Sequence, residues 1–325
     1  MDWTDHYVEA SVTNKAIELA AGAGRDGAFK DLLVDETDVT MESFANDVEI
    51  EFHQDGTGTR GVATGAIATL TISLQEGQGV NFNVGDNLVH LSSADALLDA
   101  GEVQVITAVD RDNDTITVDA DWTTPTAAGH KFVLEGDQNL KANGFKAWLP
   151  GSGVSATAFN SIDRSVDPSR LAGVDGVKGT LSGLLITDAL VQTCAKINKN
   201  GGRPNLALVS PEDFADLALE TEARGRYAKV SATEGSISFS ALEVMTGSGA
   251  VPVVADRHTQ SDQAFILDTR KIELYSTNSL PAMFKRDGSF YHRTEGVDAL
   301  YFYVYGFYGL SIQQPGTCSW IQDLY

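Results

Sequence analysis

Apolar residues recur at three- and four-residue spacings from about residue 26 to residue 52, with acidic residues between them. The apolar positions are Phe29, Leu32, Leu33, Phe44, Val48 and Phe52. This spacing places an apolar stripe along a helix, and Asp26 is suited to cap its first turn. A helix of about 25 residues spans nearly 40 Å at about 1.5 Å per residue, so we predict a strut across a domain.

Between residues 62 and 137 the pattern changes to short β-branched runs separated by Gly, Asp and Asn. The predicted strands are 68–74, 88–91, 103–109, 115–118 and 131–134. Such runs are typical of strands, and the turn residues between them predict a small all-β barrel or sandwich. The region holds twelve acidic residues against Arg111 and Lys131, so we expect a strongly negative, solvated module.

Residues 201–219 predict a loop, a short buried strand at 206–209 and a capped helix. Ser210 is suited to accept a hydrogen bond from a free amide of the first helical turn, and Pro211 is suited to the first helical position. Residues 181–198 before them have the spacing of an amphipathic helix, which Gly201-Gly202 ends. The strand-to-helix turn lacks a Gly-rich run and a Gly-x-Ser-x-Gly elbow, so it indicates scaffold rather than catalysis.

The C-terminal third predicts strands at 242–245, 251–255, 264–267 and 272–275, which together with the helices indicate an α+β region. Residues 299–313 alternate around aromatic side chains and predict a long core strand. An aromatic stripe can also stack nucleic-acid bases. A single-strand binder needs a positive groove as well, and no basic residue lies among these rings, so we favour the core strand.

Composition narrows the class of protein. The chain has 325 residues, 42% of them apolar, enough for one large core or two to three domains. Its formal charge of -22 disfavours non-specific attraction to nucleic acid. Cys194 and Cys318 lie far apart and predict buried thiols in a reducing compartment, with a disulfide left open. No signal-peptide pattern and no run of about 18 apolar residues is present, so we expect neither secretion nor membrane insertion.

Several motif-like patterns predict ordinary structure. Residues 56–61 match Gly-x-Gly-x-x-Gly, but they follow a predicted helix and precede a strand, the reverse of a dinucleotide site. Residues 110–114 resemble the start of a calcium loop, yet Thr115 and Asp121 replace the required Gly and Glu, and a hairpin turn is favoured. The six histidines lack ligand spacing, and no elbow selects a catalytic triad. We therefore predict no metal, no cofactor and no catalytic residue.

Residues 138–180 predict a long loop. Within it, Asp163 and Asp167 form a pair of carboxylates of the kind used in acid–base catalysis. Arg164 and Arg170 stand beside them, and no nearby His or Cys completes a catalytic constellation. A salt-bridge network at an interface is the favoured interpretation.

Seven short segments carry a resemblance to a known family. They are 52–58 (FHQDGTG), 147–151 (AWLPG), 163–168 (DRSVDP), 201–205 (GGRPN), 209–214 (VSPEDF), 251–257 (VPVVADR) and 264–268 (AFILD). In order and spacing they resemble major capsid proteins of tailed bacteriophages with the Hong Kong 97-type fold, over most of residues 5–320. The resemblance implies an α+β subunit with a peripheral domain on the long helix and an axial domain near the hexamer and pentamer axes.

The resemblance also implies a domain order. Residues 1–25 would be a short N-terminal extension, 26–61 the spine helix and loop of the peripheral domain, 62–137 an inserted acidic β-barrel or sandwich, 138–200 peripheral-domain loops and helix, 201–280 mainly the axial domain, and 281–325 the return strand of the peripheral domain. Residues 201–219 would lie around the joint between the two domains. Only the returning part of the usual β-hairpin extension fits before the helix, so a processed chain, a truncated chain and a reduced extension all stay open.

The implied function is self-assembly into the icosahedral phage head around double-stranded DNA, without sequence-specific binding, cofactor or catalysis. The implied partners are copies of the chain in hexamers and pentamers, with scaffold, portal and decoration proteins, and no membrane. The implied location is the virion, after assembly in the host bacterial cytoplasm. Candidate intersubunit contacts are Asp163, Arg164, Asp167, Arg170, Arg203, Arg224 and Arg226, since the planar fork of Arg suits interfaces. A tail-tube or decoration protein is the alternative, and a hydrolase with an appended β domain is a remote one.

Overall fold

The computed structural model describes residues 3–16, 26–65, 70–151, 158–176, 185–223, 229–232, 239–247, 249–285, 288–293, 296 and 298–324. The chain divides into two compact units. The first unit combines residues 1–51 with residues 274–309, and the second unit combines residues 52–273 with residues 310–325. Each unit is therefore built from segments that are distant in the sequence.

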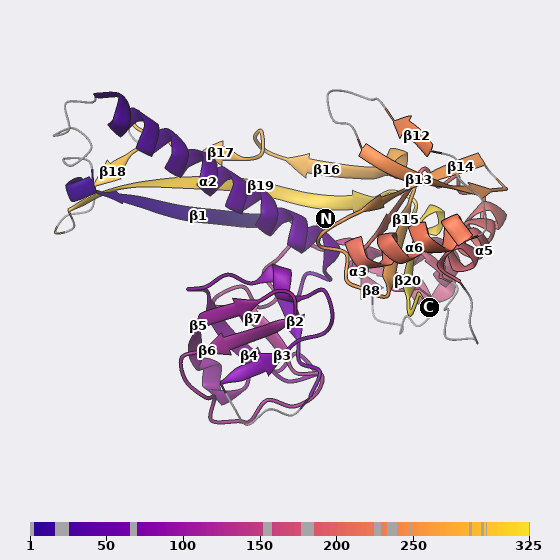
Figure 1. Cartoon of the computed structure of the whole chain (residues 1–325), viewed down its shortest axis with the longest axis horizontal. Coiled ribbons are helices and arrows are strands. Elements are labelled where there is room, and N and C mark those ends of the chain that lie inside the picture. The colour runs from indigo at the N-terminus through magenta and orange to yellow at the C-terminus, as the bar shows by residue number, and fades with distance from the viewer. Residues whose placement is uncertain are drawn as a thin grey trace. The chain divides into compact units, whose positions relative to one another are not determined.

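The first unit is an antiparallel sheet with one long helix along it (Figure 1). Strand β1 (Thr4–Thr13) pairs over its whole length with β19 (Ala299–Ile312). Three short strands, β16 (Ile272–Ser276), β17 (Ala282–Met283) and β18 (His292–Arg293), also pair with β19. Helix α2 (Asp26–His53) has 28 residues, which confirms the predicted long helix.

Alternation along β19 creates the core of the first unit. Phe302, Val304 and Tyr308 are buried, which confirms the predicted core strand. Phe44 of α2 contacts the Tyr308 ring edge-on, with 6.4 Å between ring centroids. A Cβ at Gly306 would lie 2.8 Å from the Phe44 ring, so only glycine allows the helix this close to the strand.

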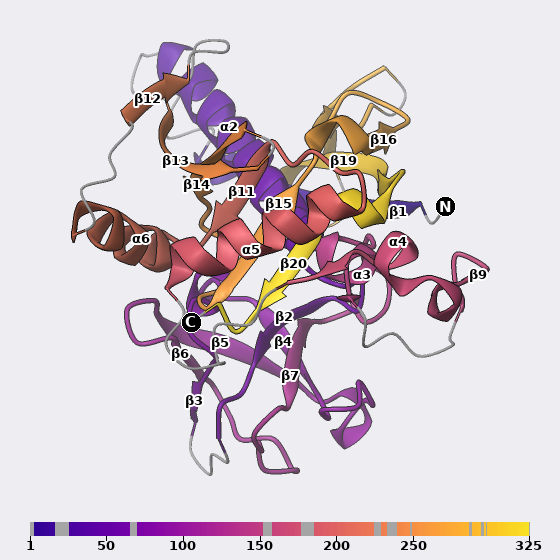
Figure 2. The same cartoon turned by 90° about the vertical axis from the view of Figure 1, so that its right-hand side faces the viewer.

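The second unit contains a seven-stranded sheet in the order β10-β20-β15-β11-β14-β13-β12. Its strands are β10 (Val174–Asp175), β11 (Leu206–Val209), β12 (Lys229–Ala232), β13 (Phe239–Thr246), β14 (Gly249–Ala255), β15 (Gln263–Leu267) and β20 (Ser319–Gln322). Helices α5 (Ile186–Lys199) and α6 (Pro211–Ala223) lie over one face of the sheet (Figure 2). The predicted strand and helix of residues 201–219 are both confirmed.

The seven-stranded sheet is buried on both faces, which explains the uninterrupted apolar run of β15. Ala264 and Ile266 pack in the core beneath α5 and α6. Phe265 and Leu267 pack in a separate core that includes Phe145. The cap of α6 also agrees with the prediction, because the Asp213 amide donates to Ser210 Oγ at 3.0 Å.

Three expected boundaries need correction. Strand β11 is the middle strand of the seven-stranded sheet, so residues 201–219 lie inside the second unit rather than at a joint. Helix α5 shares one apolar core with β11 and β14, so residue 200 does not separate two units. Residues 310–324 belong to the second unit, where β20 pairs with β15, and only residues 281–309 return to the first.

Residues 59–137 form a six-stranded sheet in the order β2-β7-β4-β5-β6-β3. Its strands are β2 (Thr59–Val62), β3 (Thr71–Ser73), β4 (Asn87–Leu91), β5 (Val103–Asp110), β6 (Thr115–Val118) and β7 (Lys131–Leu134). A bridge from Ala63 to Leu74 joins the two edges, so the sheet closes into a small barrel. Phe82, Phe132 and Trp122 fill its centre. The prediction of a small all-β barrel or sandwich is confirmed, with the barrel as the observed form.

The region predicted as one long loop contains short elements. They are α3 (Phe145–Trp148), β8 (Ala158–Phe159), β9 (Ile162–Asp163), the 3-10 turn η4 (Arg164–Val166), α4 (Pro168–Leu171) and β10. Further 3-10 turns elsewhere are η1 (Gly79–Asn81), η2 (Asp99–Gly101), η5 (Thr269–Lys271) and η6 (Pro315–Thr317). Elements of two to four residues are too short for hydrophobic periodicity to reveal.

Candidate functional site

The candidate residues of the DRSVDP segment make hydrogen bonds within their own segment. Asp163 Oδ1 accepts from the Ser165 amide at 2.9 Å and from Ser165 Oγ at 2.6 Å. These two bonds hold the pKa of Asp163 below its ordinary value. Asp167 Oδ1 accepts from Ser169 Oγ at 3.0 Å. Neither carboxylate forms an ion pair with a described arginine, so the predicted salt-bridge network is not present within one copy.

Arg164 differs from its neighbours because its side chain is buried. Its Nη1 donates to the Ala147 carbonyl at 2.8 Å, and its guanidinium carbon lies 4.1 Å from the centre of the Phe159 ring. Burial lowers the pKa of this guanidinium from its ordinary value. The residue therefore anchors η4 to the α3 turn, a role that the sequence did not predict.

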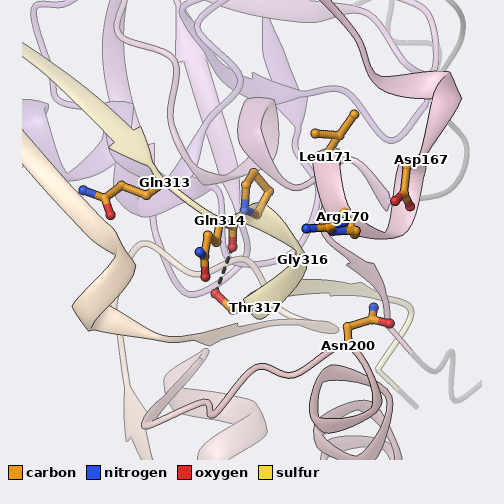
Figure 3. A pocket seen from close by; sticks show the side chains of 9 residues that line it. Asp167, Arg170, Leu171, Asn200, Gln313, Gln314, Gly316 and Thr317 are labelled. Carbon is orange, nitrogen blue, oxygen red and sulfur yellow. Dashed lines mark hydrogen bonds between the residues drawn. The ribbon is translucent and has the colours of Figure 1, made fainter.

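Asp167 and Arg170 line a hollow of about 480 Å³ in the second unit. Leu171, Asn200 and residues 313–317 complete the lining (Figure 3). Thr317 Oγ1 donates to the Gln314 carbonyl at 2.8 Å and holds the loop on one side. Gly316 fits against α4, since a Cβ there would lie 2.7 Å from the Ser169 carbonyl oxygen. The hollow combines the polar groups of Asp167, Arg170, Asn200 and Thr317 with the apolar side chains of Leu171 and Pro315.

Arg203 lines a second hollow, of about 740 Å³, together with Ala195, Asn198, Gly201, Gly202 and Gly247. Its own carbonyl accepts from Arg270 Nη2 at 2.9 Å, while its side chain is exposed. Asn198 and Asn200 at the end of α5 border the two hollows. No pattern in the sequence indicated a role for these two amide side chains. Arg224 and Arg226 lie outside the described residues.

The acidic turn at residues 110–114 is a hairpin turn, as predicted. Asp110 accepts hydrogen bonds from the Asn113 side-chain amide at 2.8 Å and from the backbone amides of Asn113 and Asp112 at 3.1 and 3.0 Å, which lower its pKa. Asp114 accepts from the amides of Gly77 and Gly79 at 2.9 and 2.7 Å. The carboxylates are therefore used to fold the barrel. The glycines at 56–61 likewise follow α2 and precede β2, as expected for a turn.

The structure brings four histidines into two buried clusters that the sequence spacing did not reveal. His90 Nε2 and His130 Nδ1 lie 2.8 Å apart inside the barrel, and burial followed by the His130 charge lowers the pKa of His90 to about 4. His53 Nε2 lies 3.2 Å from Asp256 Oδ2. His258 Nδ1 lies 3.2 Å from Asn81 Oδ1, and burial followed by the His53 charge lowers its pKa to about 4.

Neither cluster suggests catalysis or a metal. Over the residues that the structure covers, no group of three or more His, Cys, Asp or Glu side chains is arranged to hold a metal ion. Cys194 and Cys318 are both buried free thiols, and burial raises the pKa of Cys194 to about 11 and also raises that of Cys318. None of the described helices is long and apolar enough to span a membrane. A nucleophile activated for chemistry is therefore absent from the described cysteines.

The family model of the SU10 major capsid protein matches residues 126–325, and the chain belongs to this family. No curated protein matches the chain.

One solved structure has a similar fold, and two others align more weakly. The capsid asymmetric unit of cyanophage A-1(L) aligns with 99% of this chain and 77% of that chain at a TM-score of 0.51 and 11% identity. The procapsid of satellite phage P4, solved with its size determination protein, aligns with 99% of this chain and 71% of that chain, at a TM-score of 0.43 and 9% identity. The SrpI encapsulin complex from Synechococcus elongatus aligns with 42% of this chain and 49% of that chain, at a TM-score of 0.32 and 12% identity.

Family membership gives the function in outline. The chain is a structural subunit of the phage head shell, assembles with copies of itself and resides in the virion. This confirms the family resemblance and favours it over a tail-tube protein, a decoration protein and a hydrolase.

Proposed function

We propose that copies of this chain form hexamers and pentamers that close into an icosahedral shell around double-stranded DNA. The first unit, with α2 as its spine helix, serves as the peripheral domain. The seven-stranded sheet with α5 and α6 serves as the axial domain, and residues 59–137 are an insertion. The shell assembles in the host bacterial cytoplasm together with scaffold, portal and decoration proteins.

One observation carries this proposal, namely the family match over residues 126–325. The acidic balance is consistent with it, because a wall of formal charge -22 per copy resists adhesion to enclosed DNA. Ring formation also needs no catalysis. Heterologous contacts between identical copies form a closed ring when the rotation that relates one copy to the next divides a full turn evenly.

The contacts between copies are proposed to involve Asp163, Asp167, Arg170, Arg203, Arg224 and Arg226. Asp167 and Arg170 border one hollow and Arg203 borders another, so these three residues lie where a segment of a neighbouring copy can enter. Arginine forms bidentate bonds with carboxylates, and the chain has 45 acidic residues to supply them.

The test is assembly of the purified full chain. Size-exclusion chromatography and negative-stain microscopy should show closed shells, or hexameric and pentameric rings. Arg170→Glu combined with Arg203→Glu should reduce shells strongly, and Lys285→Glu, an exposed basic residue away from both hollows, serves as the control. A strict monomer, or stacked tubes with no closed shells, contradicts the proposal.

A further inference from the structure

Arg164 carries a charge that no described group of the same chain neutralises. Its side chain is only 9% exposed, and Nη1 donates to the Ala147 carbonyl at 2.8 Å. Its Nε is buried and has no hydrogen-bond partner. In the part of the chain that the structure describes, Arg164 forms no ion pair. A buried cation with an unused donor is costly unless a counter-charge and an acceptor reach it.

The carboxylates nearest in sequence are already used. Asp163 accepts two hydrogen bonds from Ser165, and Asp167 accepts one from Ser169. The Phe159 ring stabilises the guanidinium only by a cation–π contact, which leaves the Nε donor unpaired. Among the described residues, neither of these two carboxylates accepts a hydrogen bond from Arg164.

The surface beside Arg164 has the composition of an interface. Ile162 is 53% exposed and Val166 is 80% exposed, on either side of Arg164 in the sequence. Ile162 lies in the β8–β9 hairpin, which has left-handed backbone at Asn160 and Ser161 in its two-residue turn, and Val166 lies in the following turn η4. Phe159 packs edge-on against Trp148 at 5.0 Å beneath the guanidinium. Aromatic, arginine and exposed apolar side chains together are typical of the residues that dominate binding energy.

We propose that a carboxylate of a second copy of this chain binds the Arg164 guanidinium, while Ile162 and Val166 become buried against apolar side chains of that copy. This inference rests on the proposed shell, because it needs a neighbouring copy. A carboxylate is the matching anion, since the chain carries 45 acidic residues against 23 basic ones. The same charge balance, -22 in total, disfavours a DNA phosphate as the partner.

The first experiment changes Val166, whose exposed side chain can be replaced without disturbing the core. Val166→Asp should raise the chain concentration needed for half-maximal shell formation by at least about tenfold, because about 1.4 kcal/mol per contact corresponds to a factor of ten. Leu140→Asp is the matched control, with a side chain 66% exposed in the same unit, and should assemble like the unchanged chain. Equal assembly of the Val166→Asp variant and the unchanged chain overturns the inference.

The second experiment removes the charge and then locates its partner. Arg164→Leu should assemble at least about tenfold less well than the unchanged chain, and circular dichroism reports whether it still folds. A cryo-EM map of the unchanged shell should place an Asp or Glu of a neighbouring copy at the Arg164 guanidinium. A map with phosphate or only solvent there overturns this inference alone. A chain that forms no shells overturns both this inference and the proposed function.

Cross-linking gives an independent readout that does not depend on folding of the Arg164 variant. Val166→Cys introduces an accessible thiol, because Cys194 and Cys318 are both buried. A photoreactive maleimide at this position should produce covalent dimers within shells, joined to a peptide that contains Asp or Glu. Cross-links confined to single chains, or to a peptide without an acidic residue, contradict the proposal.

Discussion

Residues 59–137 build the barrel from one continuous segment, whereas the first unit joins residues near both ends of the chain. In the barrel, Asn139 donates its amide to the Thr57 carbonyl at 2.9 Å, so the entry and exit of the segment meet. In the first unit, Val8 pairs with Val304. Local closure loses less chain entropy than such long-range pairing. The barrel can therefore fold from local information, while the first unit needs most of the chain to be present.

Excision of the two regions is the strongest test of this difference. A fragment of residues 57–139 should fold into a barrel, because its core of Phe82, Phe132 and Trp122 is complete and its ends meet. A fragment of residues 3–53 should stay unfolded, since β1 lacks its partner β19. Circular dichroism and cooperative thermal unfolding distinguish the outcomes. Equal folding of both fragments would remove the distinction.

Core truncation in the full chain gives the next largest effect. Phe132→Ala in the barrel and Phe302→Ala in the first unit each remove a fully buried ring and should cost about 3–5 kcal/mol. Hydrogen exchange read by mass spectrometry should show faster exchange only in residues 59–137 for the first variant. For the second variant, the amides of β1 and β19 should both exchange faster than in the unchanged chain. Faster exchange across the whole chain in either variant would show that the two regions unfold as one.

The same contrast explains what the sequence could predict. Alternation with Gly, Asp and Asn turns located the barrel strands, and spacings of three and four located α2, because both signals are local. The pairing of β1 with β19 and the middle position of β11 depend on distant residues. They could not be read from periodicity. Strands of two residues, such as β10, carry too little pattern to detect.

The candidate site was predictable only in part. The positions of Asp167 and Arg170 were identified by charge, but the hollow they line also needs Asn200 and the Gln314–Thr317 loop, which come from separate segments. Arg164 was expected at an interface between copies, which stays a prediction, and within its own chain it lies over Phe159. The hairpin that places it there has Asn160-Ser161 in its turn, a weaker signal than Asn-Gly. Whether a charged side chain is buried depends on residues that the fold brings to it, and the residues beside it in the sequence do not indicate this.

Acid should weaken the barrel through His90. The pKa of His90 falls from 6.5 to about 4 in the folded barrel, because burial and the His130 charge disfavour the imidazolium. The unfolded chain therefore binds more protons than the folded one between pH 6.5 and 4, and stability falls as the pH is lowered through this range. At about 1.36 kcal/mol per pKa unit the full loss is about 3 kcal/mol.

Urea unfolding of the 57–139 fragment at several pH values measures this loss. His90→Phe should flatten the profile between pH 6.5 and 4, because a phenyl ring keeps the parallel stacking on Phe132 without a titrating group. An unchanged slope in the His90→Phe variant would assign the acid sensitivity of the barrel to other groups.

The smallest expected effect tests how the first unit tolerates polar groups in its core. Tyr308 donates its hydroxyl to Glu51 Oε2 at 2.6 Å, with both side chains buried. Tyr308→Phe leaves the ring packing and removes one hydrogen bond to a charged acceptor, so it should cost about 1.5–3 kcal/mol. Tyr7→Phe in the same sheet is the control, since the Tyr7 side chain is 48% exposed and its change should stay within about 0.5 kcal/mol. Denaturant unfolding of the full chain compares them, with Glu51→Gln and the double variant completing a cycle. A coupling near zero would mean that water, rather than Tyr308, satisfies Glu51, and that the first unit relies on strand pairing and apolar packing alone.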